Sequence, residues 1–393
     1  MEALLKKGID GLNLDRSDWQ LVKFGDVATQ QKQSVDRENT DLTRYVKGEH
    51  MYSEDLHLRE WGELKDEYLG PAFIRYFEKG DMLYGSRRTY LRKVTIAPFE
   101  GITSNTTFVI KANEDLIDKN LLPFLMLSDE FTEHSIRNSK GSVNPYINWK
   151  DIANYEFLLP PKEQQAEIAE LLWAMDEVIE STLALEENLK SQLMACEKAF
   201  FYNDPKSLVK LGTVLKKSIS GGTPSTIEAS FYADGKIPWI TTKILSGDFI
   251  SEGESYITES AIKNSTAKLL PLGNIVAGTR VGVGKFAINE IDLSFSQDVS
   301  GLVVDHQKVD VEFLVYQLNS YILQNRILPF ARGTTIKGIT KDDLLNVKIT
   351  LPSSEDQIEA RNKIKAIKVA LSCVLLKYNG SKFFQQSLIN QVF

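Results

Sequence analysis

The stretch that organises this sequence runs from Leu158 to Phe200 and reads LLPPKEQQAEIAELLWAMDEVIESTLALEENLKSQLMACEKAF. Pro160 and Pro161 end an extended segment and can stand at the start of a helix, and no proline or glycine follows until Pro205. Apolar residues then recur at spacings of three and four for about four heptads. The stretch therefore predicts one long helix with an apolar stripe, and such a stripe needs a partner helix.

A second stretch near the other end of the chain supplies the candidate partner. Residues 351–357 read LPSSEDQ, and 192 positions earlier residues 159–165 read LPPKEQQ. Residues 162–200 hold nine acids and three lysines, a net charge of −6, whereas residues 355–390 hold six bases and three acids, a net charge of +3. Opposite charges favour pairing of these two helices over self-pairing. The alternative is two unrelated amphipathic helices, each packed on its own domain.

Length and composition set the broad class. A chain of 393 residues suggests two or three domains with enough apolar content for real cores. It has only two cysteines, no leading apolar segment and no run of about twenty apolar residues. We therefore expect a cytoplasmic protein that folds without disulfides.

The net charge of −7 argues at first against nucleic acid, because binding to phosphates depends on Lys and Arg. Nearly all of the acidic excess, however, falls on the first long helix. The window from Met82 to Phe99 contains four basic residues and no acid. Because local charge decides such contacts, a DNA-binding surface is compatible with this sequence.

Ordered matches indicate that the chain contains one unit twice. Gly80–Arg87 corresponds to Gly273–Arg280, and Lys140–Ser142 corresponds to Arg332–Thr334. The offset stays between 187 and 193 along the whole series, which indicates duplication. Each unit is expected to be a mixed α and β domain followed by a long helix, and the strands that open and close each domain are expected to lie side by side.

We therefore predict an α+β fold: two mixed α/β domains joined by two long helices that form an antiparallel coiled coil, with a pseudo-two-fold internal repeat. Within the domains, residues 121–136 and 311–325 are expected to be helical. The predicted segments are an N-terminal arm over residues 1–19, a first domain over 20–161, a long helix and linker over 162–204, a second domain over 205–353 and a distal long helix over 354–393.

No motif in the sequence forms a catalytic constellation. Gly278–Lys285 resembles a phosphate-binding loop, but it has five residues between its glycines instead of four, and Lys285 is followed by Phe286 instead of Ser or Thr. The four histidines are scattered, without a pair at metal-ligand spacing. We expect no catalytic residue, no bound cofactor and no metal in this chain.

Candidate DNA-binding residues recur at matching places of the two copies. They combine Arg and Lys, which contact guanine or phosphate, with hydroxyl groups, aromatic rings and glycine turns. In the first unit they are Arg87, Arg88, Tyr90, Arg92, Lys93, Lys140, Ser142, Asn144 and Tyr146. In the second unit they are Gly222, Thr223, Ser225, Trp239, Thr242, Lys243, Arg280, Lys285, Arg332, Thr334 and Lys337.

Across nearly its whole length the chain resembles the specificity subunit of Type I restriction-modification enzymes. The two helix openings resemble the central and distal conserved regions of that family, and residues 221–225 (GGTPS) and 237–240 (IPWI) are similar to its target recognition domains. The first unit lacks these two segments, and Gly380 interrupts the distal helix.

The resemblance implies that each domain recognises one half of a split double-stranded DNA target and that the helices set the spacer between the halves. Two methylation subunits would dock on the helix region and carry S-adenosylmethionine, and restriction subunits would supply cleavage driven by ATP with Mg²⁺. Two alternatives remain open: a stand-alone DNA-modifying enzyme, and a coiled-coil scaffold without a DNA role.

Overall fold

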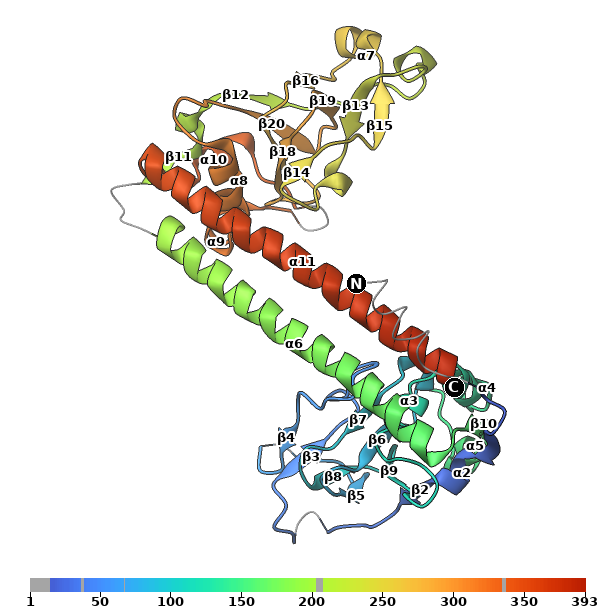
Figure 1. The fold of residues 1–393 in the computed structure, drawn as a ribbon. Coiled ribbons are helices and arrows are strands. Elements are labelled where there is room, and N and C mark those ends of the chain that lie inside the picture. Colours follow the sequence, from blue (N-terminus) through green and yellow to red (C-terminus); the bar gives the residue numbers. More distant parts are fainter. Residues whose placement is uncertain (1–14, 37–38, 67, 203–207, 334–336) are drawn as a thin grey trace. The chain divides into compact units, whose positions relative to one another are not determined.

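The computed structural model describes residues 15–36, 39–66, 68–202, 208–333 and 337–393. The chain divides into two compact units, one formed by Met1–Leu183 with Leu376–Phe393 and the other by Ala184–Leu375. Helices α6 (Lys162–Phe201) and α11 (Ser354–Val392) are the two long helices of Figure 1, and each contributes one half to each unit. The two predicted long helices are confirmed.

The globular part of the first unit contains two four-stranded sheets and a separate strand pair. The sheets have the orders β2-β9-β6-β7 and β4-β3-β8-β5. The strands are β1 (Gln20–Lys23), β2 (Ala28–Gln31), β3 (Arg44–Val46), β4 (Gly62–Glu63), β5 (Phe73–Phe77), β6 (Met82–Gly85), β7 (Val94–Ile96), β8 (Gly101–Ser104), β9 (Thr107–Ala112) and β10 (Glu156–Leu159). The short helices are α2 (Phe24–Val27), η1 (Thr89–Leu91), α3 (Leu122–Leu125), α4 (Asp129–Arg137) and α5 (Trp149–Ala153).

The globular part of the second unit repeats this plan with a five-stranded sheet, β12-β20-β17-β18-β14, and a four-stranded sheet, β15-β13-β19-β16. The strands are β11 (Leu208–Lys210), β12 (Leu215–Ser220), β13 (Ile237–Ile240), β14 (Phe249–Ile250), β15 (Ser255–Ile257), β16 (Leu269–Leu270), β17 (Ile275–Gly278), β18 (Phe286–Asn289), β19 (Leu293–Phe295), β20 (Val299–Val304) and β21 (Lys348–Thr350). The helices are η3 (Leu211–Val214), η4 (Ala229–Phe231), η5 (Thr242–Ile244), α7 (Glu259–Asn264), α8 (Val311–Asn319), α9 (Tyr321–Ile327), η6 (Leu328–Phe330) and α10 (Lys341–Asn346).

The strands that open and close each globular part pair with each other, as the sequence predicts. In the first unit β1 and β10 are antiparallel, with Leu21 opposite Leu158. In the second, β11 and β21 are antiparallel, with Val209 opposite Ile349. Each long helix therefore begins directly after a strand that is tied to the start of its own domain.

The predicted helices over residues 121–136 and 311–325 are each divided in two by a serine, which corrects the expectation of single helices. Ser128 and Ser320 both have extended backbones, and each side chain accepts a hydrogen bond from the backbone N–H three residues later. Each serine hydroxyl also donates to the carbonyl oxygen three residues earlier, that of Leu125 or Gln317. A serine in this geometry ends one helix and caps the next.

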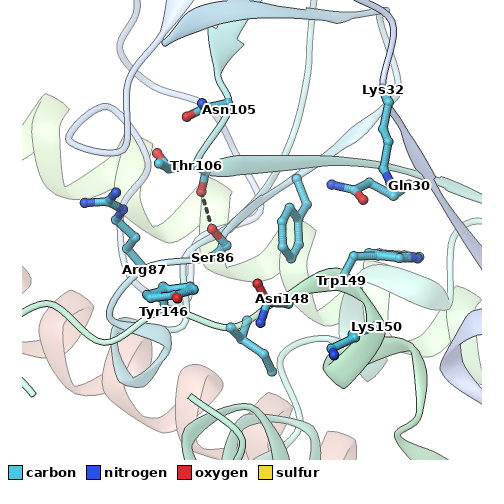
Figure 2. Close-up of a pocket in the computed structure, with 12 residues that line it drawn as sticks. Gln30, Lys32, Ser86, Arg87, Asn105, Thr106, Tyr146, Asn148, Trp149 and Lys150 are labelled. Atoms are coloured by element: carbon cyan, nitrogen blue, oxygen red, sulfur yellow. Dashed lines mark hydrogen bonds between the residues drawn. The ribbon is translucent and has the colours of Figure 1, made fainter. Parts of the chain in front are cut away.

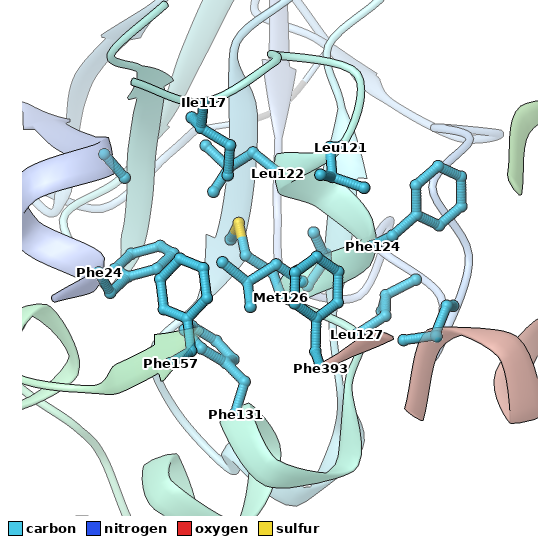
Figure 3. Packing of buried hydrophobic residues seen from close by; sticks show 14 of the residues in the cluster. Phe24, Ile117, Leu121, Leu122, Phe124, Met126, Leu127, Phe131, Phe157 and Phe393 are labelled. Atoms are coloured by element: carbon cyan, nitrogen blue, oxygen red, sulfur yellow. The ribbon is translucent and has the colours of Figure 1, made fainter. Parts of the chain in front are cut away.

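The long helices pair through their apolar stripes within each unit. In the first unit Leu172 of α6 and Leu388 of α11 belong to one buried core, which Phe393 and Phe157 also join with ring centroids 6.1 Å apart (Figure 3). In the second unit the opposite ends of the same helices meet, where Leu193 of α6 packs against the core that contains Ile364 of α11. This pairing of opposite ends is antiparallel, as predicted.

The distal helix continues through Gly380, the residue that interrupts its sequence pattern. Although Gly380 weakens helix propensity, α11 is helical from Ser354 to Val392. Gln385 and Leu388 on the far side of Gly380 are buried in the first unit, and Gln385 Nε2 donates to the carbonyl oxygen of Leu172 at 3.4 Å. Tertiary packing at both sides of the glycine offsets its local cost.

Candidate nucleic-acid interface

In the first unit two cationic residues lie on either side of one tyrosine in a short backbone ladder. Tyr146 forms antiparallel bridges with both Arg87 and Lys140. The Lys140 N–H donates to the Tyr146 carbonyl oxygen at 2.8 Å, and the Tyr146 N–H donates back at 2.9 Å. We call Arg87, Tyr146 and Lys140 the first basic ladder. Arg87 and Lys140 come from segments that are distant in the sequence, so only folding brings them together.

The second unit builds the same arrangement from Arg280, Gly338 and Arg332, which we call the second basic ladder. Gly338 forms antiparallel bridges with both arginines. The Arg332 N–H donates to the Gly338 carbonyl oxygen at 2.8 Å, and the return bond measures 2.9 Å. Cations at the two outer positions are common to both ladders, whereas the central residue changes from tyrosine to glycine.

Matching hydrogen bonds fix each ladder to its sheet. The Ser86 hydroxyl donates to the Thr106 carbonyl oxygen at 2.6 Å, as the dashed line in Figure 2 shows. In the second unit the Thr279 hydroxyl donates to the Asp298 carbonyl oxygen at 3.2 Å. Each of these bonds holds the residue just before a ladder arginine. Arg87 and Arg280 therefore occupy equivalent positions beside the sheets of their two units.

A cavity of about 500 Å³ lies beside the first basic ladder. Figure 2 shows Arg87 and Tyr146 on one side of it, and Lys32, Gln30 and Trp149 on the other. Its lining residues offer cations, amides, hydroxyls and aromatic rings, and none of these described residues is a carboxylate. The full set is Gln30, Lys32, Ser86, Arg87, Asn105, Thr106, Phe108, Tyr146, Ile147, Asn148, Trp149 and Lys150.

The wall of the cavity is held by packing and by one carboxylate behind it. The Trp149 ring meets Phe108 edge to face, with centroids 5.9 Å apart. Asp151 accepts a hydrogen bond from the Asn148 amide at 3.1 Å and forms an ion pair with Lys140 at 3.3 Å. The hydrogen bond from Asn148, followed by Lys140, lowers the pKa of Asp151 below its usual value. The carboxylate therefore positions both side chains while remaining charged.

The other predicted residues of the first unit fall into two groups. Arg88, Tyr90, Ser142 and Asn144 are exposed and free to meet a ligand at the surface. Arg92 instead forms ion pairs with Glu54, at 3.2 Å, and with Asp129. Lys93 donates to the Gly48 carbonyl oxygen, and burial lowers its pKa. These last two cations hold the domain together internally.

In the second unit several predicted residues serve packing. The carbonyl oxygen of Gly222 accepts a hydrogen bond from the Trp239 indole at 3.2 Å, and a Cβ at Gly222 would lie only 2.4 Å from the Thr266 carbonyl oxygen. Thr242 is buried, and Thr223 donates to the Gln297 side chain at 2.8 Å. Thr223 is nevertheless exposed, as are Ser225, Lys243, Arg280, Arg332 and Lys337. Thr334 lies outside the described residues.

Lys285 lies at a different place from the second basic ladder. It lines a cavity of about 730 Å³ together with Asp248 and with Lys368 of α11. Neither Arg280 nor Arg332, which the sequence groups with Lys285, lines this cavity.

Of the twelve residues that line the first cavity, only Arg87 and Tyr146 are among the candidates that the sequence suggested. The ten others include Gln30, Lys32, Asn105, Thr106, Trp149 and Lys150. Two signals could have indicated part of this set. Asn105 and Thr106 fall in a segment that recurs in the second copy as Gln297 and Asp298. Trp149 and Lys150 lie two and three residues after the repeated isoleucine at 147. Gln30 and Lys32 carry no such signal, because the pairing of β2 with β9 alone brings them here.

The sequence profile of the Type I restriction modification DNA specificity domain matches residues 16–194 and again residues 203–367. The chain belongs to this family. Each match to the Type I restriction modification DNA specificity domain covers one globular part and the first portion of the long helix that follows it, and the two matches together cover most of the chain.

Curated relatives are specificity subunits of Type I restriction enzymes. The EcoR124I/EcoR124II specificity subunit of Escherichia coli is 27% identical over 194 residues, which are 46% of this chain and 47% of that protein. The chain thus spans about half the length of this relative in the match. The MjaVIII specificity subunit of Methanocaldococcus jannaschii is 23% identical over 401 residues, covering 92% of this chain and 88% of that protein.

Solved structures show the same fold. The Type-I restriction-modification system S subunit from M. genitalium aligns with a TM-score of 0.63 at 14% identity, covering 97% of this chain and 98% of that one. In the described part of the present chain, no helix has the length and apolarity needed to cross a membrane. The same residues contain no group of three or more His, Cys, Asp or Glu side chains that could hold a metal ion.

Proposed function

We propose that this chain is the DNA-recognition subunit of a Type I restriction-modification complex and that it recognises a bipartite target with one domain per half-site. The observation that carries the proposal is the pair of basic ladders. Two cationic side chains stand at matching positions of each unit, in a member of a DNA-specificity family. A duplicated, cationic surface suits a ligand that presents two separate patches of phosphates and base edges.

The chemistry of each ladder fits duplex DNA. An arginine can donate two hydrogen bonds to the O6 and N7 atoms of guanine, whereas lysine acts more often as a point charge on phosphate. In the first unit, Lys32 and Lys150 add positive charge around the same cavity, and its amide side chains offer both donors and acceptors. The ladders differ at Tyr146 and Gly338, so the two units would recognise different half-sites.

Partner subunits would supply the chemistry. We propose that two methylation subunits dock on the helix region and modify adenine with S-adenosylmethionine, and that restriction subunits cleave DNA using ATP and Mg²⁺, all in the cytoplasm. An apolar surface in the second unit supports docking of a protein. Met194, Tyr202 and Tyr321 are 59%, 63% and 66% exposed and line a cavity of about 490 Å³ between α6 and α9. Exposed apolar clusters of this kind mark protein interfaces.

Selection from a random DNA library tests the proposal. The chain, purified with its methylation subunit, should enrich one motif made of two short half-sites around a fixed gap. Comparison of genomic adenine methylation with and without the gene should show loss of the same motif. Enrichment of DNA without a bipartite motif would contradict the proposed recognition.

The two alternatives give different results in the same experiments. A stand-alone enzyme would methylate or cleave DNA as the purified chain alone. A scaffold without a DNA role would enrich no sequence, and replacement of Arg87 and Arg280 by Ala would change nothing in the selected pool.

A further inference from the structure

Each long helix begins with the same uncharged anchor to its own domain. In the first unit the buried side chain of Gln165 accepts a hydrogen bond from the Asp118 N–H at 2.6 Å and donates to the Pro160 carbonyl oxygen at 2.8 Å. In the second unit Gln357 accepts from the Asp310 N–H at 2.9 Å and donates to the Pro352 carbonyl oxygen at 3.0 Å. This shared anchor cannot distinguish one domain from the other.

Charged contacts about one to four turns further along the helices do differ. In the first unit the helix supplies the acids. His57 Nε2 lies 2.7 Å from Asp176 Oδ2 on α6, and Arg59 contacts both oxygens of Glu180 at 2.5 and 3.1 Å. Asp55, in the same loop, orients Arg59 through a contact of 2.6 Å. Asp176 and Glu180 are four residues apart and therefore share one face of α6.

In the second unit the helix supplies the bases. Lys368 of α11 contacts Asp248 at 2.6 Å, and Arg361 contacts Asp310 at 2.6 Å. A third pair joins Lys365 to Glu312 at 3.0 Å. The Asn319 amide also donates to Asp248 at 2.9 Å and holds it toward the helix.

One contact of each set occupies a corresponding place, whereas Glu180 corresponds to Ser372 and Lys365 to Trp173. Asp176 and Lys368 lie 192 positions apart, the same offset that separates Gln165 from Gln357. Their partners lie one residue apart in the repeat. The Ile96 N–H donates to the carbonyl oxygen of Leu56, the residue before His57, whereas the Ile288 N–H donates to the carbonyl oxygen of Asp248 itself. The polarity is thus inverted at one position of the repeat.

We propose that this inverted polarity determines which domain docks on which helix, so that each recognition domain keeps to its own helix. The contact from Gln165 or Gln357 lets either domain approach either helix. The charges then determine which helix each domain binds. The loop with His57 and Arg59 is attracted to an acidic helix, and the domain with Asp248 is attracted to a basic helix. In the wrong position like charges would meet in partly buried sites, which is costly.

A charge-exchange cycle in the full chain tests the contact between His57 and Asp176. Asp176→Lys should lower the midpoint of thermal unfolding by about 4 °C or more, because the new lysine faces His57 and Arg59. Adding His57→Asp should restore at least half of that loss, because the pair then has the polarity of Asp248 and Lys368. Glu177→Lys is the matched control: it makes the same change of net charge at an exposed neighbouring position and should shift the midpoint by less than about 1 °C.

A domain exchange tests the selection itself. Residues 20–161 are replaced by a second copy of residues 205–353, once with α6 unchanged and once with Ala169→Arg, Trp173→Lys and Asp176→Lys, which copy the basic positions of α11. Limited proteolysis should remove the copied domain at least fivefold more slowly from the chain with the basic α6.

Two results would overturn the proposal. One is a charge-exchange pair that is no more stable than Asp176→Lys alone. The other is equal digestion of the two exchanged chains, whether fast or slow, because polarity would then not decide docking. Neither readout involves DNA, so a failure here is distinct from a failure of the proposed recognition of bipartite targets.

Discussion

Asp176 on α6 accepts a hydrogen bond from His57 of the first domain at 2.7 Å, with Glu180 3.9 Å from the same ring nitrogen. The hydrogen bond to Asp176 is the largest cause of a raised His57 pKa, and the charges of Asp176, Glu180 and Asp55 act in the same direction while desolvation opposes them. The folded protein therefore binds the histidine proton more tightly than the unfolded chain does.

This relationship predicts a pH dependence of stability. The contribution of protonated His57 should be fully present below its unfolded pKa of 6.5 and should be lost as the pH rises through the higher folded value. Thermal unfolding of the protein and of His57→Gln, measured from pH 5 to 9, should show midpoints that converge toward the alkaline end. A constant difference between the two proteins across this range would contradict the prediction.

Removal of the Gln165 anchor should destabilise the first unit. Gln165→Leu leaves the buried carbonyl oxygen of Pro160, and the partly buried carbonyl oxygen of Leu116 and N–H of Asp118, without their partner. An unsatisfied buried group costs about 1–3 kcal/mol, so we expect a loss of about 2–4 kcal/mol in the free energy of unfolding, measured by urea titration. Gln192→Leu, on the exposed face of the same helix, should change it by less than about 0.5 kcal/mol.

Gly222 should tolerate no side chain. Because a Cβ there would lie 2.4 Å from the Thr266 carbonyl oxygen, Gly222→Ala must displace backbone in the second unit. Overpacking of this kind costs about 1–3 kcal/mol and should appear in calorimetry. Gly247→Ala is the control, because a Cβ at that position meets nothing within 4 Å. Equally mild effects of the two substitutions would contradict this prediction.

The two ladder arginines should act on separate half-sites. Arg87→Ala should relax base preference in one half of the selected motif, and Arg280→Ala in the other, each by about 1–3 kcal/mol at the affected base pair. The readout is sequence selection combined with fluorescence anisotropy at two salt concentrations. Arg137→Ala removes a cation that is 73% exposed on α4, where it pairs with Glu133, and should leave both halves unchanged. Loss of binding without a change in preference would assign Arg87 to phosphate contact.

Local patterns in the sequence were sufficient to predict the architecture. The proline pair before residue 162, the apolar spacing that follows and the ordered matches at a nearly constant offset predict both long helices and the duplicated domains, and the structure has them. These features depend on near neighbours along the chain, or on comparison of the chain with itself. Strand pairing of β1 with β10 followed from the same repeat.

The tertiary structure alone decided which side chains share a site. Tyr146 meets Arg87 and Lys140, and Gln30 reaches the same cavity, because sheet pairing joins segments far apart in the sequence. The tertiary structure also decided which residues the charged side chains of the long helices pair with. Their opposite net charges suggested contacts between the two helices, but Asp176 pairs with His57 and Lys368 with Asp248, each on a globular domain. A charge on a helix is attracted to any opposite charge within reach, and only packing determines which one that is.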